Sequence, residues 1–577
     1  MSRKDGTAQQ LRAPSGPNAR SVTGLGIAAG RSLRRPEGLG GLLLAILLSL
    51  AFACWLYSPA HLLGTSASWQ QQAGDVTQYL AGFNAFVREP WHWPLLRITS
   101  LNYPAGTLAT FVDAIPLYAV LLKLIHHGSD VTFWNPYGYW IGICYVMQGV
   151  GSWWICREAN LKSWVALASL TVLLSAFPAL THRIHHISLM SQWILLFAFA
   201  VYLRGMRRGV LASGAWITLL VCAFYINIYL FCMSSVLFMA DLARHVRLGQ
   251  RRRAMVTGLG MAVVLGASLF ITMLPLPEGA GARDWGYGYY SMNLLAPFSG
   301  GKLLSFPHPT VHDGQGEGFN YLGIFVIGLF IYALRLQRRY APTFWSRHAM
   351  LASAVVLMAL YAPSNLVHLG EVRLFELALP GWTGGITSQL RVSGRFFWPA
   401  GYAVTVFAVI MTQRYGKARW SALLLPAIVL LHLWDLRPHH ERARESVHHT
   451  FPVMIDEVKW SAFLGTQTET LYFYPPFRCG KAGANETLLP TMFYASKYKL
   501  NMTTGYLSRS VKPCDNYAQE ISQATAPGNA FVFARNEFPE LDAVLNMLGG
   551  KDAANCIAVD AVYLCKRTQA ISHKTEE

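Results

Sequence analysis

The run LGGLLLAILLSLAFACWLYS, residues 39–58, decides the fold class of this chain. It contains no charged residue over the roughly 20 positions that a helix needs to cross a bilayer, and the basic stretch RSLRRPEG precedes it at 31–38. A cleaved signal peptide has a shorter charged region and a small-residue exit, so an uncleaved first span fits better. We therefore expect an integral membrane protein, with residues 1–38 as a basic cytoplasmic tail.

The composition supports this class and excludes others. Only 14% of the 577 residues are Asp, Glu, Lys or Arg, against about 25% in soluble proteins, and 53% are hydrophobic. A disordered chain, a collagen-like fibre and a small disulfide scaffold are excluded. The net charge of +18 lies largely in short loops beside apolar runs, which is the positive-inside pattern. The bilayer is therefore an expected partner, and nucleic acid is not.

Eleven apolar ranges are candidate membrane spans, although the two within 212–242 are either a hairpin or one long tilted helix. The apolar segment 108–125 differs, because it contains Asp113 and Pro116, and counting it as a span breaks the parity of the topology. We expect it to be a helix at the membrane surface, within a first external loop at 59–136. The expected spans are 39–58, 137–155, 164–180, 189–204, 212–226, 229–242, 254–275, 320–336, 347–363, 395–412 and 420–434.

The basic loops set the orientation of these spans. Clusters of arginine and lysine near 204–208, 244–253, 335–347 and 414–419 should face the cytoplasm. The N-terminus is then cytoplasmic, and everything after residue 434 lies outside. The predicted fold class is an all-α polytopic membrane protein, with a transmembrane domain at 39–437.

The region 438–577 changes composition and predicts a small extracytoplasmic α/β domain. Short strand-like runs such as LYFY, FVFA and CIAVDAVYLC alternate with polar stretches. It holds four of the nine cysteines, an even number in a compartment expected to be oxidising, which suggests two disulfides. Proximity favours Cys479 with Cys514 and Cys556 with Cys565; four free thiols are the alternative.

Two acidic residues of the first external loop are candidates for chemistry. Asp75 follows the first span closely, where a carboxylate is suited to be a general base that accepts a proton from an attacking hydroxyl. The alternative is a helix N-cap, since GD precedes VTQYLAGF. Asp113 is costly in an apolar helix and should face a polar cavity or pair with an arginine.

The other polar candidates lie in later external segments. The turn THRIHHISLMSQW carries His182, Arg183, His185 and His186. The imidazoles are suited to bind a phosphate, a metal ion or a sugar hydroxyl, and a cap for two helix ends is the alternative. Glu317 and Tyr321 lie in GEGFNYLG, where Glu317 would bind sugar hydroxyls or orient an arginine. No dedicated metal spacing occurs. We therefore expect no cofactor, and a divalent metal is not favoured.

The segment SQLRVSGRFFWPAGY holds Arg391 and Arg395 four residues apart. If the helix has begun there, both guanidiniums share one face and make a phosphate or pyrophosphate clamp; snorkelling to lipid headgroups is the alternative. Ser393 and Gly394 would let a ligand approach the backbone closely. No nucleotide-binding or serine hydrolase motif occurs in a fitting context.

With these residues in view, the chain resembles the GT-C superfamily of polytopic glycosyltransferases, closest to a bacterial family within it. The resemblance spreads over about residues 70–400. The pieces that carry it are GD at 74–75, PWHWPL at 90–95, NYPAGTLATFVDAIPLYA at 102–119, RIHHISLMSQW at 183–193, EGFNYLG at 317–323 and RVSGRFFWP at 391–399.

The resemblance implies chemistry on the outer face of a bacterial inner membrane, with a polyprenyl-phosphate-linked sugar as donor. It implies that Asp75, the acidic residue of the first external loop, is catalytic. Asp113, Arg183, His185, His186, Glu317, Tyr321, Arg391 and Arg395 would contact or position substrates. The acceptor is an envelope glycan, a lipid or a protein.

Two other functions are compatible with the sequence. A flippase for a lipid-linked glycan would need polar residues along a path through the bilayer, often with internal repeats. No repeat occurs here, and the polar residues gather at one face. A non-catalytic envelope assembly protein would use the C-terminal domain to bind a partner, and would tolerate loss of the Asp75 carboxylate.

Overall fold

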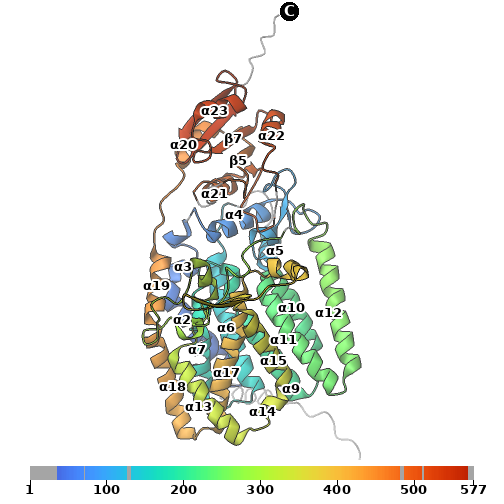
Figure 1. Ribbon diagram of the computed structural model, residues 1–577, viewed down its shortest axis with the longest axis vertical. Helices are drawn as coiled ribbons and strands as arrows, with labels where there is room; N and C mark the ends of the chain where they lie inside the picture. Colours follow the sequence, from blue (N-terminus) through green and yellow to red (C-terminus); the bar gives the residue numbers. More distant parts are fainter. Residues whose placement is uncertain are drawn as a thin grey trace, which may run out of the picture.

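The structure, a computed structural model, describes residues 35–70, 72–126, 132–281, 283–480, 486–509 and 512–568. The expected tail at 1–38 therefore lies almost wholly outside the described residues. A bundle of long helices forms the body of the molecule, and a small domain with a β-sheet lies at one end of it (Figure 1).

Each of the eleven expected spans overlaps a helix of the bundle. These helices are α2 (Leu39–Tyr57), α6 (Tyr137–Glu158), α7 (Trp164–Ser175), α9 (Trp193–Arg208), α10 (Ser213–Ile226), α11 (Ile228–Arg247), α12 (Arg251–Thr272), α13 (Ile324–Tyr340), α15 (Ala349–Tyr361), α17 (Trp398–Tyr415) and α18 (Ala418–Asp435). The range 212–242 is a pair of helices, α10 and α11, interrupted at Asn227, whose side chain accepts a hydrogen bond from the Tyr229 N–H.

Fewer of these helices are long and apolar enough to cross a membrane by themselves. Among the described residues there are five, or six if α18 and the helix α19 (Arg437–His448), bent by 57°, form one span. The five cover Leu39–Tyr57, Trp164–Thr181, Ile187–Arg208, Arg251–Thr272 and Ser393–Tyr415.

The remaining helices fall short for physical reasons. Helices α10 and α15 have 14 and 13 residues, or about 20 Å at 1.5 Å per residue, against a hydrocarbon core of about 30 Å. Helices α11 and α13 end in the charged sequences ADLARHVR and RLQRR, and α6 is rich in Trp, Tyr and Gly.

The outer helix faces indicate a membrane environment independently of helix length. Helix α12 lies at the edge of the bundle (Figure 1), with Leu259, Val263 and Phe270 each more than 60% exposed. Leu360 of α15 and Leu430 of α18 are each 69% exposed. Large apolar side chains exposed along several helices do not suit water, so this is a multi-pass membrane protein.

The basic helix ends meet at the end of the bundle remote from the small domain. Arg207 of α9 pairs with Glu158 of α6 at 2.8 Å, and Arg414 of α17 donates to the carbonyl of Ala159. Arg347, from the short helix α14 (Phe344–Arg347), lines a cavity with both arginines. By the positive-inside pattern, we expect this end of the bundle to face the cytoplasm.

The segment 108–125 is broken and does not form one helix. A 3-10 turn, η2 (Ala109–Val112), is followed by α5 (Pro116–Ile125), which at 10 residues is too short to span a bilayer. Asp113 and Ile115 between them have φ of +52° and +51°. A β-branched residue such as Ile is strained in this left-handed region, so the break is held in place by its surroundings.

The C-terminal domain is α/β, as the sequence predicts. Its sheet has the order β6-β5-β7-β9-β8, in which β5 is parallel to β6 and β7, and β9 is antiparallel to β7 and β8. The strands are β5 (Thr470–Tyr474), β6 (Asn501–Met502), β7 (Asn529–Ala534), β8 (Ala554–Val559) and β9 (Val562–Arg567), and the helices are α20 (Glu457–Leu464), α21 (Leu488–Tyr498), α22 (Tyr517–Gln523) and α23 (Leu541–Met547).

Both predicted disulfides are confirmed: Cys479 bonds Cys514, and Cys556 bonds Cys565 across β8 and β9. The five other cysteines, all in bundle helices, are free. A domain with two disulfides is consistent with an extracytoplasmic location.

The C-terminal domain is attached to the first external loop by backbone hydrogen bonds. Met502 N–H donates to the Ser100 carbonyl at 2.8 Å, and Tyr103 N–H donates to the Met502 carbonyl at 3.0 Å. Helix α21 packs on α4 (Asp75–Arg88), where Arg88 donates to the carbonyl of Ser496. The domain therefore covers α4, the helix that begins with Asp75 (Figure 1).

This orientation predicts which cysteines an impermeant reagent reaches in intact spheroplasts. After treatment with an impermeant reductant, Cys514, the exposed member of the Cys479–Cys514 disulfide, should react with a maleimide-PEG added outside. A cysteine introduced by Arg347→Cys should react only after the cells are opened. Labelling of Arg347→Cys from outside, or protection of Cys514 until the cells are opened, would contradict the orientation.

Candidate functional site

The carboxylate of Glu317 is the centre of a cluster of five charged side chains at the end of the bundle next to the C-terminal domain. Arg183 Nη1 lies 2.6 Å from Glu317 Oε2, and Arg395 Nη2 and Nε lie 2.8 and 3.0 Å from the same oxygen. His186 Nε2 lies 3.1 Å from Glu317 Oε1. Both carboxylate oxygens are therefore engaged, which leaves Glu317 little capacity to bind a sugar hydroxyl.

Asp75 joins this cluster through the other nitrogen of the same imidazole. His186 Nδ1 lies 2.7 Å from Asp75 Oδ2, so the ring bridges two carboxylates. Asp75 is the first residue of α4, after Gly74, which occupies the N-cap position with φ of +75°. The cap reading of Asp75 is therefore wrong.

The cluster combines anchored and accessible parts. Arg183 is 1% exposed, while the side chains of Asp75 and His186 are 31% and 29% exposed. Asp75 and His186 are therefore open to solvent, whereas Arg183 supports the cluster from within the bundle. With His186 protonated, the cluster contains three positive and two negative side chains, so it carries one net positive charge.

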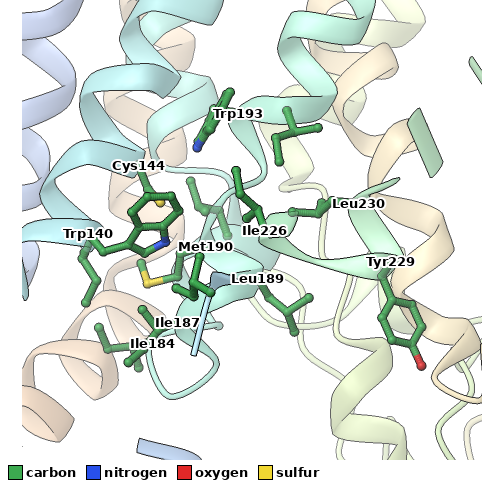
Figure 2. Close-up of a cluster of buried hydrophobic side chains, with 14 of the residues drawn as sticks. Trp140, Cys144, Ile184, Ile187, Leu189, Met190, Trp193, Ile226, Tyr229 and Leu230 are labelled. Atoms are coloured by element: carbon green, nitrogen blue, oxygen red, sulfur yellow. The ribbon is translucent and has the colours of Figure 1, made fainter. Parts of the chain in front are cut away.

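The turn that carries Arg183 and His186 is fixed by an apolar cluster below it. Figure 2 shows Ile184, Ile187 and Met190 lying among Trp140 and Cys144 of α6. Ser188, in the 3-10 turn η3 (Ile187–Met190), is hydrogen bonded to Tyr79 of α4 at 2.9 Å. The turn is therefore held rigidly against α4, which carries Asp75.

The segments that carry Glu317 and Arg395 touch backbone to backbone. A Cβ at Gly394 would lie 2.6 Å from the Gly318 Cα, and the Asn320 amide donates to the carbonyls of both glycines at 2.9 Å. Gly394 therefore lets two segments of the chain meet, and the expectation that it admits a ligand is wrong. Ser393 is likewise buried and donates to the Ala362 carbonyl.

Arg391 and Arg395 do not form the expected clamp. The helix begins as a 3-10 turn, η7 (Ser393–Phe397), so Arg391 precedes it and the i, i+4 geometry is absent. Arg395 pairs with Glu317, whereas Arg391 Nη1 lies 3.1 Å from Asp284 Oδ2. The two arginines thus belong to two separate clusters.

The remaining sequence candidates lie outside the network of Glu317. Tyr321 is fully buried and donates to Asp435 Oδ2 at 2.6 Å, so its hydroxyl is not presented to a substrate. His185 is exposed and makes no side-chain hydrogen bond to any described residue. Asp113 has no ion pair or side-chain hydrogen bond in the described part of the chain, so the arginine pairing considered for it is not formed.

The surroundings shift the pKa values of His186, Glu317 and Asp113 in different ways. Burial would lower the pKa of His186, but hydrogen bonds and charge from Asp75 and Glu317 outweigh it and raise the pKa to about 9. Burial would raise the pKa of Glu317, but Arg183, Arg395 and His186 hold it well below its usual value. Burial and the nearby charge of Asp75 raise the pKa of Asp113 to about 6.

Sequence reasoning missed the partners that the C-terminal domain brings to this end. The loop 504–509 lies over the site, where Gln78 of α4 donates to the Tyr506 carbonyl at 2.8 Å and Ser508 N–H donates to the Phe111 carbonyl at 2.9 Å. Arg478 and Arg509 join Arg391 at Asp284. The positive charge of these arginines is the only feature of the sequence that could have indicated an ion pair with a carboxylate. Nothing in the sequence shows that the partner is Asp284.

Two other features were considered as sites. A cavity of about 630 Å³ lies at the basic end, with mostly apolar walls, and its carboxylate, Glu158, is paired with Arg207. Within the described residues, no group of three or more His, Cys, Asp or Glu is arranged to hold a metal ion. The charged cluster around Glu317 is therefore the candidate site.

Comparison with known proteins gives a family. Residues 46–437 match the profile described as Domain of unknown function (DUF6311), and residues 459–567 match the DUF6311 C-terminal domain. The chain belongs to the DUF6311 family. A search of the curated proteins found no match. The first match spans the helical bundle and every residue of the Glu317 cluster, and the second spans the sheet domain that covers it.

The raised pKa of His186 predicts a pH-dependent contribution to stability. A histidine whose pKa is raised on folding stabilises the protein fully below about 6.5, and that contribution is lost as the pH rises through about 9. We expect a loss of roughly 1–2 kcal/mol over this window, reduced by the partial exposure of the ring. Melting in detergent should show this loss for wild type and His308→Gln, but not for His186→Gln. If the melting temperature depended on pH in the same way for all three proteins, the Asp75–His186–Glu317 bridge would be contradicted.

Asp113→Asn should stabilise the protein. Folding raises the pKa of Asp113 from its ordinary value of 3.8 to about 6. Above pH 6 the ionised carboxylate therefore lowers the free energy of unfolding, and this penalty shrinks as the pH falls from 6 toward the ordinary value. At pH 7.5 the variant should gain roughly 1–2 kcal/mol in unfolding free energy, and the gain should vanish near pH 4. A lower melting temperature at pH 7.5 would show that Asp113 has a structural partner.

Proposed function

We propose that this protein is a glycosyltransferase of a bacterial inner membrane, with eleven spans and its chemistry on the outer face. It moves a sugar from a polyprenyl-phosphate donor to an envelope acceptor, and Asp75 is the general base. One observation carries the proposal. Asp75 is bridged by His186 to Glu317 and two arginines, at the outer end of a membrane bundle and beneath the C-terminal domain.

The proposed reaction is a single displacement at the sugar. The acceptor oxygen attacks the anomeric carbon, the bond from that carbon to the phosphate oxygen breaks, and the acceptor proton passes to Asp75. The hydrogen bond from His186 fixes the orientation of the Asp75 carboxylate toward the acceptor. Asp113, which has no ion-pair partner among the described residues, lies in the field of Asp75 and is suited to position the acceptor hydroxyl.

Arg395 is the residue best placed to receive the leaving phosphate. Its Nε and Nη2 donate to Glu317, and its Nη1 makes no hydrogen bond to any described residue. The charge on the phosphate grows as the bond breaks, so a preoriented guanidinium stabilises the transition state more than the ground state. Glu317 thus orients Arg395, and it fixes Arg183 below and His186 beside it.

The distribution of charge favours a transferase over a flippase. A flippase needs polar groups along the bundle, whereas two acidic groups at the end expected to be cytoplasmic, Asp241 and Glu158, are each paired with an arginine. Asp241 is fully buried and accepts from Arg244 at 2.8 Å and from the Trp216 indole at 2.8 Å. Glu158 pairs with Arg207 in the same way.

The test is the glycan composition of the envelope in cells with wild type, a deletion, or Asp75→Asn at matched expression. Asp75→Asn should lose the same sugar as the deletion, by about 10²–10⁴-fold, because a general base is removed. The matched control is Asp313→Asn, an exposed acidic residue on the same face that lies outside the cluster. It should keep the sugar.

The melting temperature of Asp75→Asn must stay close to that of wild type for the loss to be assigned to chemistry. The sugar that disappears identifies the donor. If Asp75→Asn retains wild-type glycan, the general-base assignment fails, and a flippase or an assembly protein becomes the better explanation.

A further inference from the structure

A second charged cluster lies where the loop after α12 meets the C-terminal domain; we call it the Asp284 seam. Asp284 Oδ2 lies 3.1 Å from Arg391 Nη1, 3.2 Å from Arg478 Nη2 and 3.5 Å from Arg509 Nη1. The Asp284 side chain is 5% exposed, and the three arginine side chains are 29%, 35% and 15% exposed. One carboxylate cannot neutralise three guanidiniums, so a surplus of two positive charges stays partly open to solvent.

Neutral partners orient two of these guanidiniums without removing their charge. Arg391 Nη1 also donates to the Trp285 carbonyl at 3.0 Å, and Arg509 Nη2 donates to Gln389 Oε1 at 2.8 Å. An arginine has five N–H donors in a fixed fork, so several remain for a ligand. Oriented guanidiniums with surplus charge suit a phosphate or carboxylate.

An aromatic platform lies beside these arginines. Trp285 is 66% exposed, and its ring centroid lies 5.4 Å from that of Tyr289 and 5.7 Å from that of Tyr290. The guanidinium carbon of Arg391 lies 5.5 Å from the centroid of the Tyr290 ring. Gly286 makes this arrangement feasible, because its φ is +115° and a Cβ would lie 2.5 Å from the Tyr290 ring. Exposed aromatic faces next to guanidiniums are suited to stack on sugar rings that carry charged groups.

We propose that the Asp284 seam binds an anionic glycan, a sugar chain that carries phosphate or carboxylate groups, and that this glycan is the acceptor. Its role as acceptor rests on the proposed function, whereas its binding does not. Two of the three arginines come from the C-terminal domain, away from the bilayer in which a lipid-linked donor is anchored. The loop that carries Arg509 also contacts Gln78 of α4, so a glycan held at the seam lies beside the path to Asp75.

The binding test uses the full chain in nanodiscs of uncharged lipid, with dextran sulfate as the anionic probe and dextran as its uncharged match. Wild type should bind dextran sulfate in a salt-dependent manner and bind dextran at least tenfold more weakly.

The double variant Arg478→Gln/Arg509→Gln should weaken dextran sulfate binding at least tenfold. Asp284→Asn should strengthen it severalfold, because the competing carboxylate is removed. The matched control is Arg373→Gln, a 61% exposed arginine of β4 (Val372–Glu376) that should bind as wild type.

The alternative is that the seam only fastens the C-terminal domain to the bundle. In that case the double arginine variant binds dextran sulfate as Arg373→Gln does, which overturns the proposal. Weaker binding by a folded Asp284→Asn also overturns it. Asp75→Asn should bind the probe normally. If that variant also keeps the wild-type envelope glycan, the transferase assignment fails while the anionic glycan site stands.

Discussion

The arrangement of the outer end depends on one carboxylate, that of Glu317. It gathers groups from two distant parts of the chain: Arg183 and His186 from the turn before α9, and Arg395 from the 3-10 turn η7 before α17. A buried arginine such as Arg183 is tolerated only when its charge is compensated, and Glu317 compensates it at 2.6 Å. The same carboxylate holds His186 against Asp75, so the group proposed to do chemistry is positioned through an ion-pair network and not by its own helix alone.

The surrounding structure serves to keep that network in place. Below it, an apolar cluster around Ile187 and Met190 fixes the turn (Figure 2). Beside it, Gly318 and Gly394 let two segments meet at their backbones. Above it, the C-terminal domain shares backbone hydrogen bonds with residues 100–103 and extends the loop 504–509 over α4. The division into a helical bundle and a covering domain coincides with the two profiles of the DUF6311 family.

Local patterns in the sequence predicted the elements well and their pairings poorly. Apolar periodicity located the helices, and an even cysteine count with short separations located both disulfides. The residues of the Glu317 cluster were identified as candidates because their acidic, imidazole and guanidinium side chains lie in expected external segments or at the start of a span. Their partners were not, because Glu317 lies 134 residues from Arg183 and Asp284 lies 225 from Arg509. No local signal encodes such pairings, and this is why the arginine clamp was wrong and the Asp284 seam was missed. Helix α10 begins and ends within one residue of its expected range, whereas α15 has 13 residues where the range 347–363 was expected.

The central claim is that the outer cluster receives the phosphate of a lipid-linked donor. An electron cryo-microscopy structure of the full chain in nanodiscs with undecaprenyl phosphate tests it most directly. The account predicts phosphate density within hydrogen-bonding distance of Arg395 and close to Asp75, with the polyprenyl chain leaving toward the bilayer. Phosphate density at the basic end of the bundle, with the cluster around Glu317 empty, would contradict it.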